Sequence, residues 1–244
     1  NWLKTTKAQW SPGGLGLTGN HAFTVPNTDA KGDLFNEWNT GTNVTTITVS
    51  SEGKFTAYYG TPKVHDVAVT EVKPYKTVVF QGFNQNVTVT VLDLGGWTEN
   101  LNVTLYANAT EIETQEKTVQ NGHSEDIPFT WNATGFETGN YTISAYAWPV
   151  PNETDTSDNN LTGGWVTVSI EGDLTGATQN VRDFVPDGLV DMMDIGVVAS
   201  YFLQPISPTS ANCDTTGSTP GVPDGIIDMT DIGIIASHYL QGDP

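Results

Sequence analysis

The C-terminal third of the chain contains one stretch twice: PDGLVDMMDIGVVASYFL at residues 186–203 and PDGIIDMTDIGIIASHYL at residues 223–240. Eleven of the eighteen positions are identical, and most of the others exchange one aliphatic side chain for another. Each copy places a glycine directly after its first aspartate, with further aspartates four and seven positions after that first one. The stretch therefore predicts a repeated structural unit that is rich in carboxylate oxygens.

The second half of each copy has the periodicity of an amphipathic helix. Apolar side chains recur at i, i+3, i+4 and i+7, a spacing that places them on one face of an α-helix. These positions are Ile195, Val198, Ala199 and Phe202 in the first copy, and Ile232, Ile235, Ala236 and Tyr239 in the second. We therefore predict two helices whose apolar faces pack on each other.

The aspartate spacing matches the second half of a calcium-binding loop. Calcium takes about six to eight oxygen ligands, and an EF-hand-type loop supplies them from positions 1, 3, 5, 7, 9 and 12, with glycine at position 6. If Asp187 and Asp224 occupy position 5, the glycines that follow them fall at position 6. The sequence then predicts two calcium ions. The first is held by Asp173, Thr175, Asp187, the Leu189 carbonyl, Asp191 and Asp194, and the second by Asp214, Thr216, Asp224, the Ile226 carbonyl, Asp228 and Asp231.

Both predicted loops contain an inserted segment. Asp173 precedes Asp187 by fourteen residues and Asp214 precedes Asp224 by ten, whereas an uninterrupted loop needs four. Residues 176–186 and 217–223 are therefore interpreted as excursions, which a loop tolerates because closure entropy grows slowly with length, provided that their ends lie close together. The alternative interpretation is a turn followed by a helix cap, since Asp and Gly commonly supply both. The duplication favours the metal.

Residues 172–242 resemble the type I dockerin module, in which two calcium loops, each followed by a helix, form a compact pseudo-symmetric domain. The resemblance is carried by the two D-G-x-x-D-x-x-D stretches and the helices after them. It implies a calcium-dependent module that docks onto a β-sandwich receptor, a cohesin, on another protein. Dockerins commonly recognise that partner through a pair of hydroxyl residues before the last loop acid. This chain has Met192 and Met193, and Met229 and Thr230, at those positions. Methionines suit an apolar, adaptable contact, and packing inside the module is the alternative.

The chain is strongly acidic. It has 28 aspartates and glutamates against 9 lysines and arginines, a formal net charge of −19 and a pI of about 4.1. Such a charge argues against nucleic-acid binding, which needs basic patches. It is consistent with bound calcium and also with plain solubility. No apolar run approaches the roughly 18 residues that a membrane-spanning helix requires, so we expect no membrane span.

Asn-x-Ser/Thr sequons are concentrated between residues 43 and 160. Their asparagines are Asn43, Asn86, Asn102, Asn108, Asn132, Asn140, Asn152 and Asn160. We expect N-linked glycans there and hence an extracellular or cell-surface location, although Thr-rich strands also generate such triplets by composition. The single cysteine, Cys213, excludes an intramolecular disulfide. The first residue, Asn1, is consistent with removal of a signal peptide or with a fragment.

Residues 63–171 have the period-two pattern of short β-strands. Valine alternates with threonine over 87–91, and similar alternation recurs over 101–105 and 127–131. Together with runs at 67–72, 78–80, 141–147 and 165–170, this predicts seven strands and an antiparallel, immunoglobulin-like β-sandwich. Asn86 and Asn102 fall in the polar phase of their strands, which supports this register.

The same segment resembles the CARDB family, an immunoglobulin-like adhesion module common on prokaryotic, especially archaeal, surfaces. The resemblance is carried by DVAV at 66–69, NVTVTV at 86–91, GNYTI at 139–143 and ETDTSDNN at 153–160. It implies the sandwich fold more directly than any one function.

Residues 1–62 match no family pattern. Alternation on both sides of Ser51-Glu52-Gly53 predicts a β-hairpin over residues 42–59. Because a lone hairpin is marginal in water, we expect it to pack on other parts of the chain or on a neighbouring subunit. The fold class predicted for the whole chain is mainly β. It consists of an N-terminal β-rich segment (1–62), an immunoglobulin-like sandwich (63–171) and a small helical, dockerin-like calcium domain (172–244).

No catalytic motif stands out, and we expect a protein that is not an enzyme. Residues 170–173 join the last predicted strand to the first predicted ligand without a flexible linker. The leading hypothesis is therefore a subunit of an extracellular filament or surface layer, which joins other copies of itself through calcium-stabilised contacts between its dockerin and the sandwich or N-terminal strands of the next copy. One alternative is an adhesion or scaffold module that docks onto a separate cohesin-like protein. Another is the C-terminal binding tail of a secreted carbohydrate-active enzyme.

Overall fold

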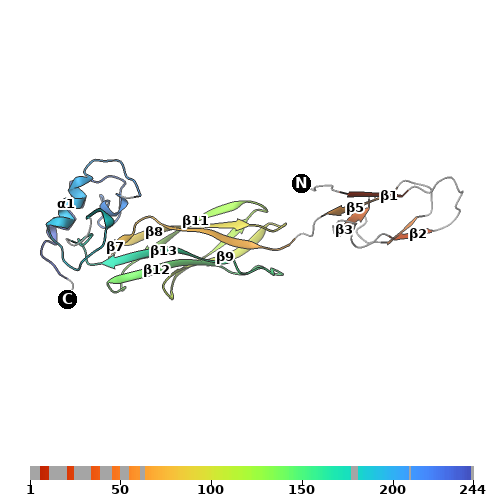
Figure 1. Ribbon diagram of the computed structural model, residues 1–244, viewed down its shortest axis with the longest axis horizontal. Helices are drawn as coiled ribbons and strands as arrows, with labels where there is room; N and C mark the ends of the chain where they lie inside the picture. The colour runs from red at the N-terminus through yellow and green to blue at the C-terminus, as the bar shows by residue number, and fades with distance from the viewer. Residues whose placement is uncertain are drawn as a thin grey trace. The chain divides into compact units, whose positions relative to one another are not determined.

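The structure is a computed structural model of the chain. It describes residues 64–176, 181–208 and 210–242, together with the backbone of five strands before residue 64 (Figure 1). The chain divides into two compact units, residues 1–64 and 65–244. The second unit contains both the predicted sandwich and the predicted calcium loops.

The first unit contains two small antiparallel sheets. In one, β5 lies between β1 and β3, and in the other, β2 pairs with β4. These strands are β1 (Thr6–Trp10), β2 (His21–Thr24), β3 (Leu34–Trp38), β4 (Thr46–Val49) and β5 (Phe55–Gly60). The predicted hairpin over residues 42–59 is wrong, because its two arms, β4 and β5, belong to different sheets. Alternation indicates that a segment is a strand but does not select its partner. Here β4 and β5 pair with earlier strands and not with each other.

The second unit begins with a β-sandwich of two sheets. One sheet has the strand order β10-β9-β12-β13-β7 and the other the order β11-β8-β6. The strands are β6 (Val67–Pro74), β7 (Val78–Phe80), β8 (Asn84–Asp93), β9 (Glu99–Ala107), β10 (Thr110–Val119), β11 (Ser124–Asn132), β12 (Gly139–Ala147) and β13 (Asn160–Ser169). Neighbouring strands are antiparallel, except that β7 runs parallel to β13. The mainly β, sandwich-like expectation is confirmed.

The sequence prediction of the sandwich lacks one strand, β10. Its sequence, TEIETQEKTV, has little apolar alternation, and most of its side chains are exposed. β10 lies at the edge of its sheet and is held by backbone pairing with β9. The signal that reveals the other strands, alternate burial, is therefore weak in β10. In β8, by contrast, Val87, Val89 and Val91 are all buried in the sandwich core.

The two sheets approach each other closely at Gly163 in β13. A Cβ atom at this position would lie 2.6 Å from the Cβ of Val72 in β6, and closer still to the Val72 carbonyl oxygen. Because β13 and β6 belong to different sheets, a side chain here would force the sheets apart.

We expect Gly163→Ala to lower the free energy of unfolding by about 2–3 kcal/mol, at the upper end of what overpacking costs. Urea unfolding followed by circular dichroism measures this. The matched control is Gly196→Ala in the helix described next, where a Cβ would meet nothing within 4 Å. Alanine is expected to raise stability there by about 0.5–1 kcal/mol. Equal stabilities of the two variants would contradict the close approach.

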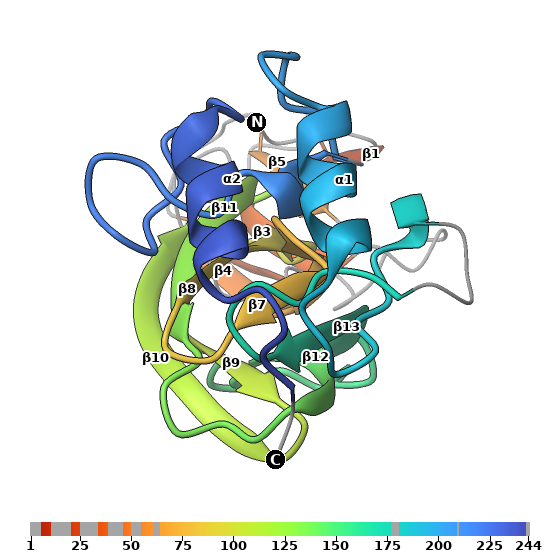
Figure 2. The same ribbon diagram turned by 90° about the vertical axis from the view of Figure 1, so that its left-hand side faces the viewer.

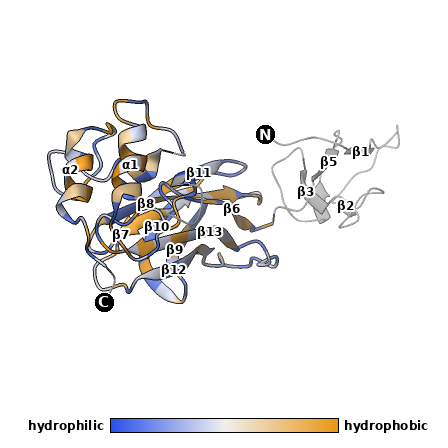
Figure 3. Cartoon of the chain, turned by 60° about the vertical axis from the view of Figure 1, so that its left-hand side comes forward, coloured by the Kyte–Doolittle hydropathy of each residue, from blue (hydrophilic) through white to orange (hydrophobic). Residues whose placement is uncertain are grey.

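The rest of the second unit, called the helical module below (residues 170–242), is built around two short helices. These are α1 (Met192–Ser200) and α2 (Met229–Ser237), which lie side by side (Figure 2) and are rich in apolar residues (Figure 3). Short 3-10 turns, η1 (Val181–Asp183) and η2 (Ala211–Cys213), precede them. The helices are in place as predicted from the periodicity.

The predicted apolar faces of the helices are partly wrong. The buried residues are Asp194, Val197 and Val198 in α1, and Asp231 and Ile235 in α2. Ala199, Phe202, Ala236 and Tyr239, which the periodicity assigned to the apolar face, are exposed. The difference arises because the last aspartate of each loop is itself buried, so that the buried face begins at that residue. Both helices also end before the predicted aromatic residue.

The two repeats of the helical module are interlocked. The N–H of Leu203, after α1, donates to the carbonyl of Ile227 in the second repeat over 2.8 Å. The N–H of Leu240, after α2, donates to the carbonyl of Val190 in the first repeat over the same distance. Both leucines have positive φ angles, 54° and 66°. The segment after each helix therefore completes the other repeat.

The helical module and the sandwich share a hydrophobic cluster. Val78 and Phe80 of β7 pack in one cluster with residues of both repeats: Leu174, Phe184, Val190, Val197, Val198, Cys213, Ile227 and Ile235. The main sandwich core forms a separate cluster. The sandwich and the helical module are therefore two architectures within one compact unit.

Candidate metal centre

The carboxylate of Asp173 closes the first loop across its inserted segment. Its Oδ1 accepts a hydrogen bond from the N–H of Asp187 (3.2 Å), and its Oδ2 accepts one from the N–H of Gly188 (2.8 Å). Gly176, at the start of the excursion, lies so close to Asp187 that a Cβ would come within 2.7 Å of the Asp187 Cβ. The two ends of this excursion are therefore close together, as the predicted loop requires.

Asp194 holds the other side of the first loop. Its Oδ1 accepts hydrogen bonds from the N–H groups of Leu174 (2.7 Å) and Thr175 (2.9 Å), and its Oδ2 accepts one from the N–H of Asp191 (2.8 Å). Asp191 in turn caps α1 through a bond from the N–H of Met193. The helix cap that the sequence offered as an alternative is therefore present, in the form of a capping box, but it uses only one of the three bonds to Asp194.

The second loop repeats this pattern. Asp214 accepts from the N–H groups of Asp224 (3.3 Å) and Gly225 (3.0 Å). Asp231 accepts from the N–H groups of Thr215 (2.6 Å), Thr216 (3.0 Å) and Asp228 (2.9 Å). The two loops therefore share one backbone arrangement in which the residues at positions 1 and 12 face inward.

The predicted ligands at position 5 of the two loops lie at the surface. The carboxylates of Asp187 and Asp224 are exposed, and each accepts a bond from the N–H two residues later, at Leu189 and Ile226 respectively. In the described part of the chain, no three Asp, Glu, His or Cys side chains already converge to hold a metal ion. A cation here would therefore draw on hydroxyl, carbonyl and water oxygens in addition to carboxylates, as calcium sites do.

Burial makes negative charge costly at the inner positions of both loops. It raises the pKa of Asp173 to about 7, and the nearby Asp194 carboxylate contributes to that rise. Burial also raises the pKa of Asp194 and of Asp214, although the Lys76 ammonium opposes the rise at Asp214. A cation bound beside these carboxylates would favour their charged form and so offset the cost of burying them.

One buried oxygen of the first loop is unused. The hydroxyl of Thr175, at predicted position 3, is buried and makes no hydrogen bond within the described structure. Such an oxygen ordinarily costs free energy unless it finds a partner. Its place beside Asp173 and Asp194, and the all-oxygen donor set, fit a hard cation such as calcium.

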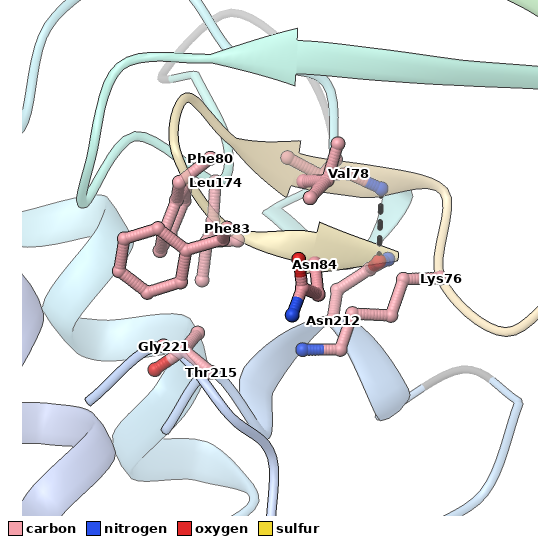
Figure 4. Close-up of a pocket in the computed structure, with 10 residues that line it drawn as sticks. Lys76, Val78, Phe80, Phe83, Asn84, Leu174, Asn212, Thr215 and Gly221 are labelled. Atoms are coloured by element: carbon pink, nitrogen blue, oxygen red, sulfur yellow. Dashed lines mark hydrogen bonds between the residues drawn. The ribbon is translucent and has the colours of Figure 1, made fainter. Parts of the chain in front are cut away.

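The junction with the sandwich brings two further polar residues to the second loop (Figure 4). The Asn212 Oδ1 accepts from the N–H groups of Thr77 (2.9 Å) and Val78 (3.0 Å), and its amide donates to the Thr77 hydroxyl (2.8 Å). Lys76, which is only 7% exposed, donates to the carbonyl of Asp214. Burial lowers the pKa of Lys76 to about 8. Sequence reasoning missed both residues, because nothing in the local pattern relates positions about 135 residues apart.

The predicted partner-binding residues are mostly at the surface of the module. Met192 and Met229 are 61% and 65% exposed, Met193 is half-buried, and Thr230 is exposed with its hydroxyl bonded to Asp228. Neighbouring chain segments of the module expose further aliphatic side chains. Leu189 and Leu240 come together through the pairing of residues 189 and 242, and Ile226 and Leu203 do so through the Leu203 to Ile227 bond.

The sequon asparagines that the structure describes are all exposed: Asn86, Asn102, Asn108, Asn132, Asn140, Asn152 and Asn160. Asn43 lies outside the described residues. Exposure is necessary for glycan attachment and is consistent with the predicted register of β8 and β9.

Comparisons with protein-family models and with curated proteins found no match. Among solved structures, the chain is similar to the CARDB domain of a Pyrococcus furiosus protein. The crystal structure of that domain, in complex with di-metal ions, is 25% identical with a TM-score of 0.37, over 43% of this chain and 89% of that one. The solution NMR structure of the same domain is also 25% identical, with a TM-score of 0.38, over 45% of this chain and 100% of that one. A β-glucosidase from Erythrobacter marinus is 14% identical with a TM-score of 0.35, over 43% of this chain and 15% of that one.

Within the described residues, no helix is both long and apolar enough to span a membrane.

Proposed function

We propose that this chain is a non-enzymatic extracellular structural protein that binds calcium through its duplicated loops and assembles with further copies of itself. The observation that carries the proposal is the cluster shared by β7 and both repeats. Because the helical module is packed onto the sandwich, any contact made by the module has a fixed orientation relative to the sandwich. A fixed orientation is what a regular head-to-tail assembly needs.

Calcium is supported by the chemistry of the loops. Residues 172–244 contain ten aspartates against one arginine, and both loops direct buried carboxylates inward. In the first loop, the buried Thr175 hydroxyl offers a further oxygen. A bound calcium ion would offset the charge of Asp173 and Asp194 and accept that hydroxyl as a ligand. It would also hold together the two ends of the excursion.

The contact surface is proposed to be the exposed apolar residues at the loop-to-helix junctions. Met192 and Met229 occupy equivalent positions in the two repeats and are both largely exposed. Flexible methionine side chains suit a contact of this kind. The sandwich or the N-terminal strands of the next copy are the expected partner, and strand addition at a sheet edge would strengthen such a contact.

The extracellular location is supported by the exposed sequons. An N-linked glycan needs an accessible asparagine in a loop or on the polar face of a strand, and the seven described sequons meet that condition.

The proposal is tested by light scattering and electron microscopy on the purified chain, first in millimolar calcium and then in excess EGTA. Regular fibres or sheets that form in calcium and come apart on chelation are expected. The variant Met192→Glu with Met229→Glu should bind calcium but remain monomeric. Val222→Glu is the matched control, since Val222 is an exposed apolar residue of the helical module outside the loop-to-helix junctions, and it should assemble normally. A folded monomer at every protein concentration in calcium would contradict self-assembly and favour a separate receptor.

A further inference from the structure

The two loops share a backbone but differ in the charges that face them. In the first loop, the carboxylates of Asp194 and Asp187 raise the pKa of Asp173, and the carboxylate of Asp191 raises the pKa of Asp194. The charged groups that shift these two pKa values include no cation in the described part of the chain. The second loop receives a buried cation from the sandwich. Lys76 donates to the Asp214 carbonyl, and the negative charges of the Asp214 and Asp231 carboxylates both raise the pKa of its ammonium.

The threonine hydroxyl at predicted position 3 also differs between the two loops, and this difference again favours a cation at the first loop. Thr175 in the first loop has a buried hydroxyl without a hydrogen-bond partner in the described structure. Thr216, its equivalent in the second loop, accepts a bond from the N–H of Gly221 (3.0 Å) and contacts the Thr219 carbonyl at 3.4 Å. The first loop therefore offers a free oxygen, whereas the second loop has already used the corresponding one.

Lys76 is confined to this position. Figure 4 shows it beside Asn212, which is bonded to the backbone of β7, in a small cavity also lined by Thr215 and Gly221. The cavity has a volume of about 10 Å³, which is at the lower limit for one water molecule. The ammonium is therefore not surrounded by water that would screen its charge from the loop.

We infer that Lys76 makes the two calcium loops unequal: the first loop is the tight calcium site, and in the second the ammonium of Lys76 supplies positive charge that opposes calcium. This inference rests on the proposed function, because it assumes that the loops bind calcium at all. A fixed unit charge near a divalent ion in partly buried surroundings lowers its affinity on the order of tenfold or more. Lys76 thus determines metal occupancy from the sandwich, without being a ligand.

The test is isothermal titration calorimetry of the full chain with calcium chloride after removal of metal. The wild-type chain is expected to show one tight site and one site on the order of tenfold weaker or more. Lys76→Met should strengthen the weak site to within a few-fold of the tight one. Lys73→Met is the matched control, since Lys73 is an exposed lysine of β6, and it should leave both sites unchanged.

Two aspartate variants assign the sites even if Lys76→Met does not fold. Asp173→Asn should remove the tight site, whereas Asp214→Asn should remove only the weak one. Two sites of equal affinity in the wild-type chain, or an unchanged weak site in folded Lys76→Met, would overturn the inference and leave the proposed calcium binding intact. Absence of calcium binding in the wild-type chain would overturn both.

Discussion

An Asp194→Ala variant is expected to lose calcium binding at the first loop and to destabilise the helical module by about 3 kcal/mol or more in EGTA. Three N–H groups, those of Leu174, Thr175 and Asp191, donate to this one carboxylate. Alanine would leave them without their partner in a buried site, at a cost of about 1–3 kcal/mol for each group that water cannot reach. Calorimetry and urea unfolding in EGTA measure the two effects.

Asp194→Asn separates charge from hydrogen bonding. The amide oxygen can still accept from Leu174 and Thr175, but its NH₂ group would face the N–H of Asp191. We therefore expect Asp194→Asn to be more stable than Asp194→Ala in EGTA, while calcium affinity at the first loop falls on the order of tenfold or more in both. Retention of normal calcium affinity by the asparagine variant would show that Asp194 only caps the helix.

The second large effect is expected from Phe80→Ala. Phe80 is 3% exposed and packs in the cluster that joins β7 to both repeats. Its ring lies edge-on to the ring of Phe83, and the two ring centroids are 5.5 Å apart. Truncating a buried phenylalanine costs about 3–5 kcal/mol. Because this cluster supports the loops, calcium affinity should fall together with the free energy of unfolding.

Phe129→Ala is the matched control for Phe80→Ala. Phe129 is 1% exposed but lies in the separate sandwich core. Its loss should cost a similar free energy of unfolding, while calcium affinity of the folded protein stays unchanged. Equal effects of the two variants on calcium affinity would show that the loops depend only on overall stability, and that the shared cluster has no special role. Both quantities come from urea unfolding and calorimetry on each variant.

The parts of this protein that the sequence reveals are those encoded by local spacing. The aspartates from 187 to 194 and their repeat could be predicted to occupy equivalent places because the same spacing occurs twice, and the structure gives Asp194 and Asp231 equivalent hydrogen bonds. The valines of β8 could be assigned to a core because a strand alternates its faces. Asp173 could be predicted to lie near Asp187 despite the inserted segment, because the loop pattern places a carboxylate upstream of each copy, and the structure brings the two together.

What the sequence does not reveal depends on contacts between distant segments. β4 and β5 are strands, yet their partners are chosen by the whole sheet and not by the short link between them. Lys76 reads as an ordinary lysine between two strands, and only the packing of β7 against the second repeat brings it to Asp214. The buried face of α1 includes a carboxylate that any hydropathy pattern places outside the core.

The interlocked repeats have a consequence for how the protein is made. The first repeat is completed by Leu240, whose N–H bonds to Val190 fifty residues earlier in the chain. When the ribosome has synthesised the sandwich and the first loop, it has not yet synthesised the segment that closes that loop. The sandwich can fold during translation, as domains generally do from the N-terminus, but the first repeat cannot reach its final form until Leu240 has emerged from the ribosome. The two repeats of the helical module are therefore expected to fold together, and not one after the other during translation.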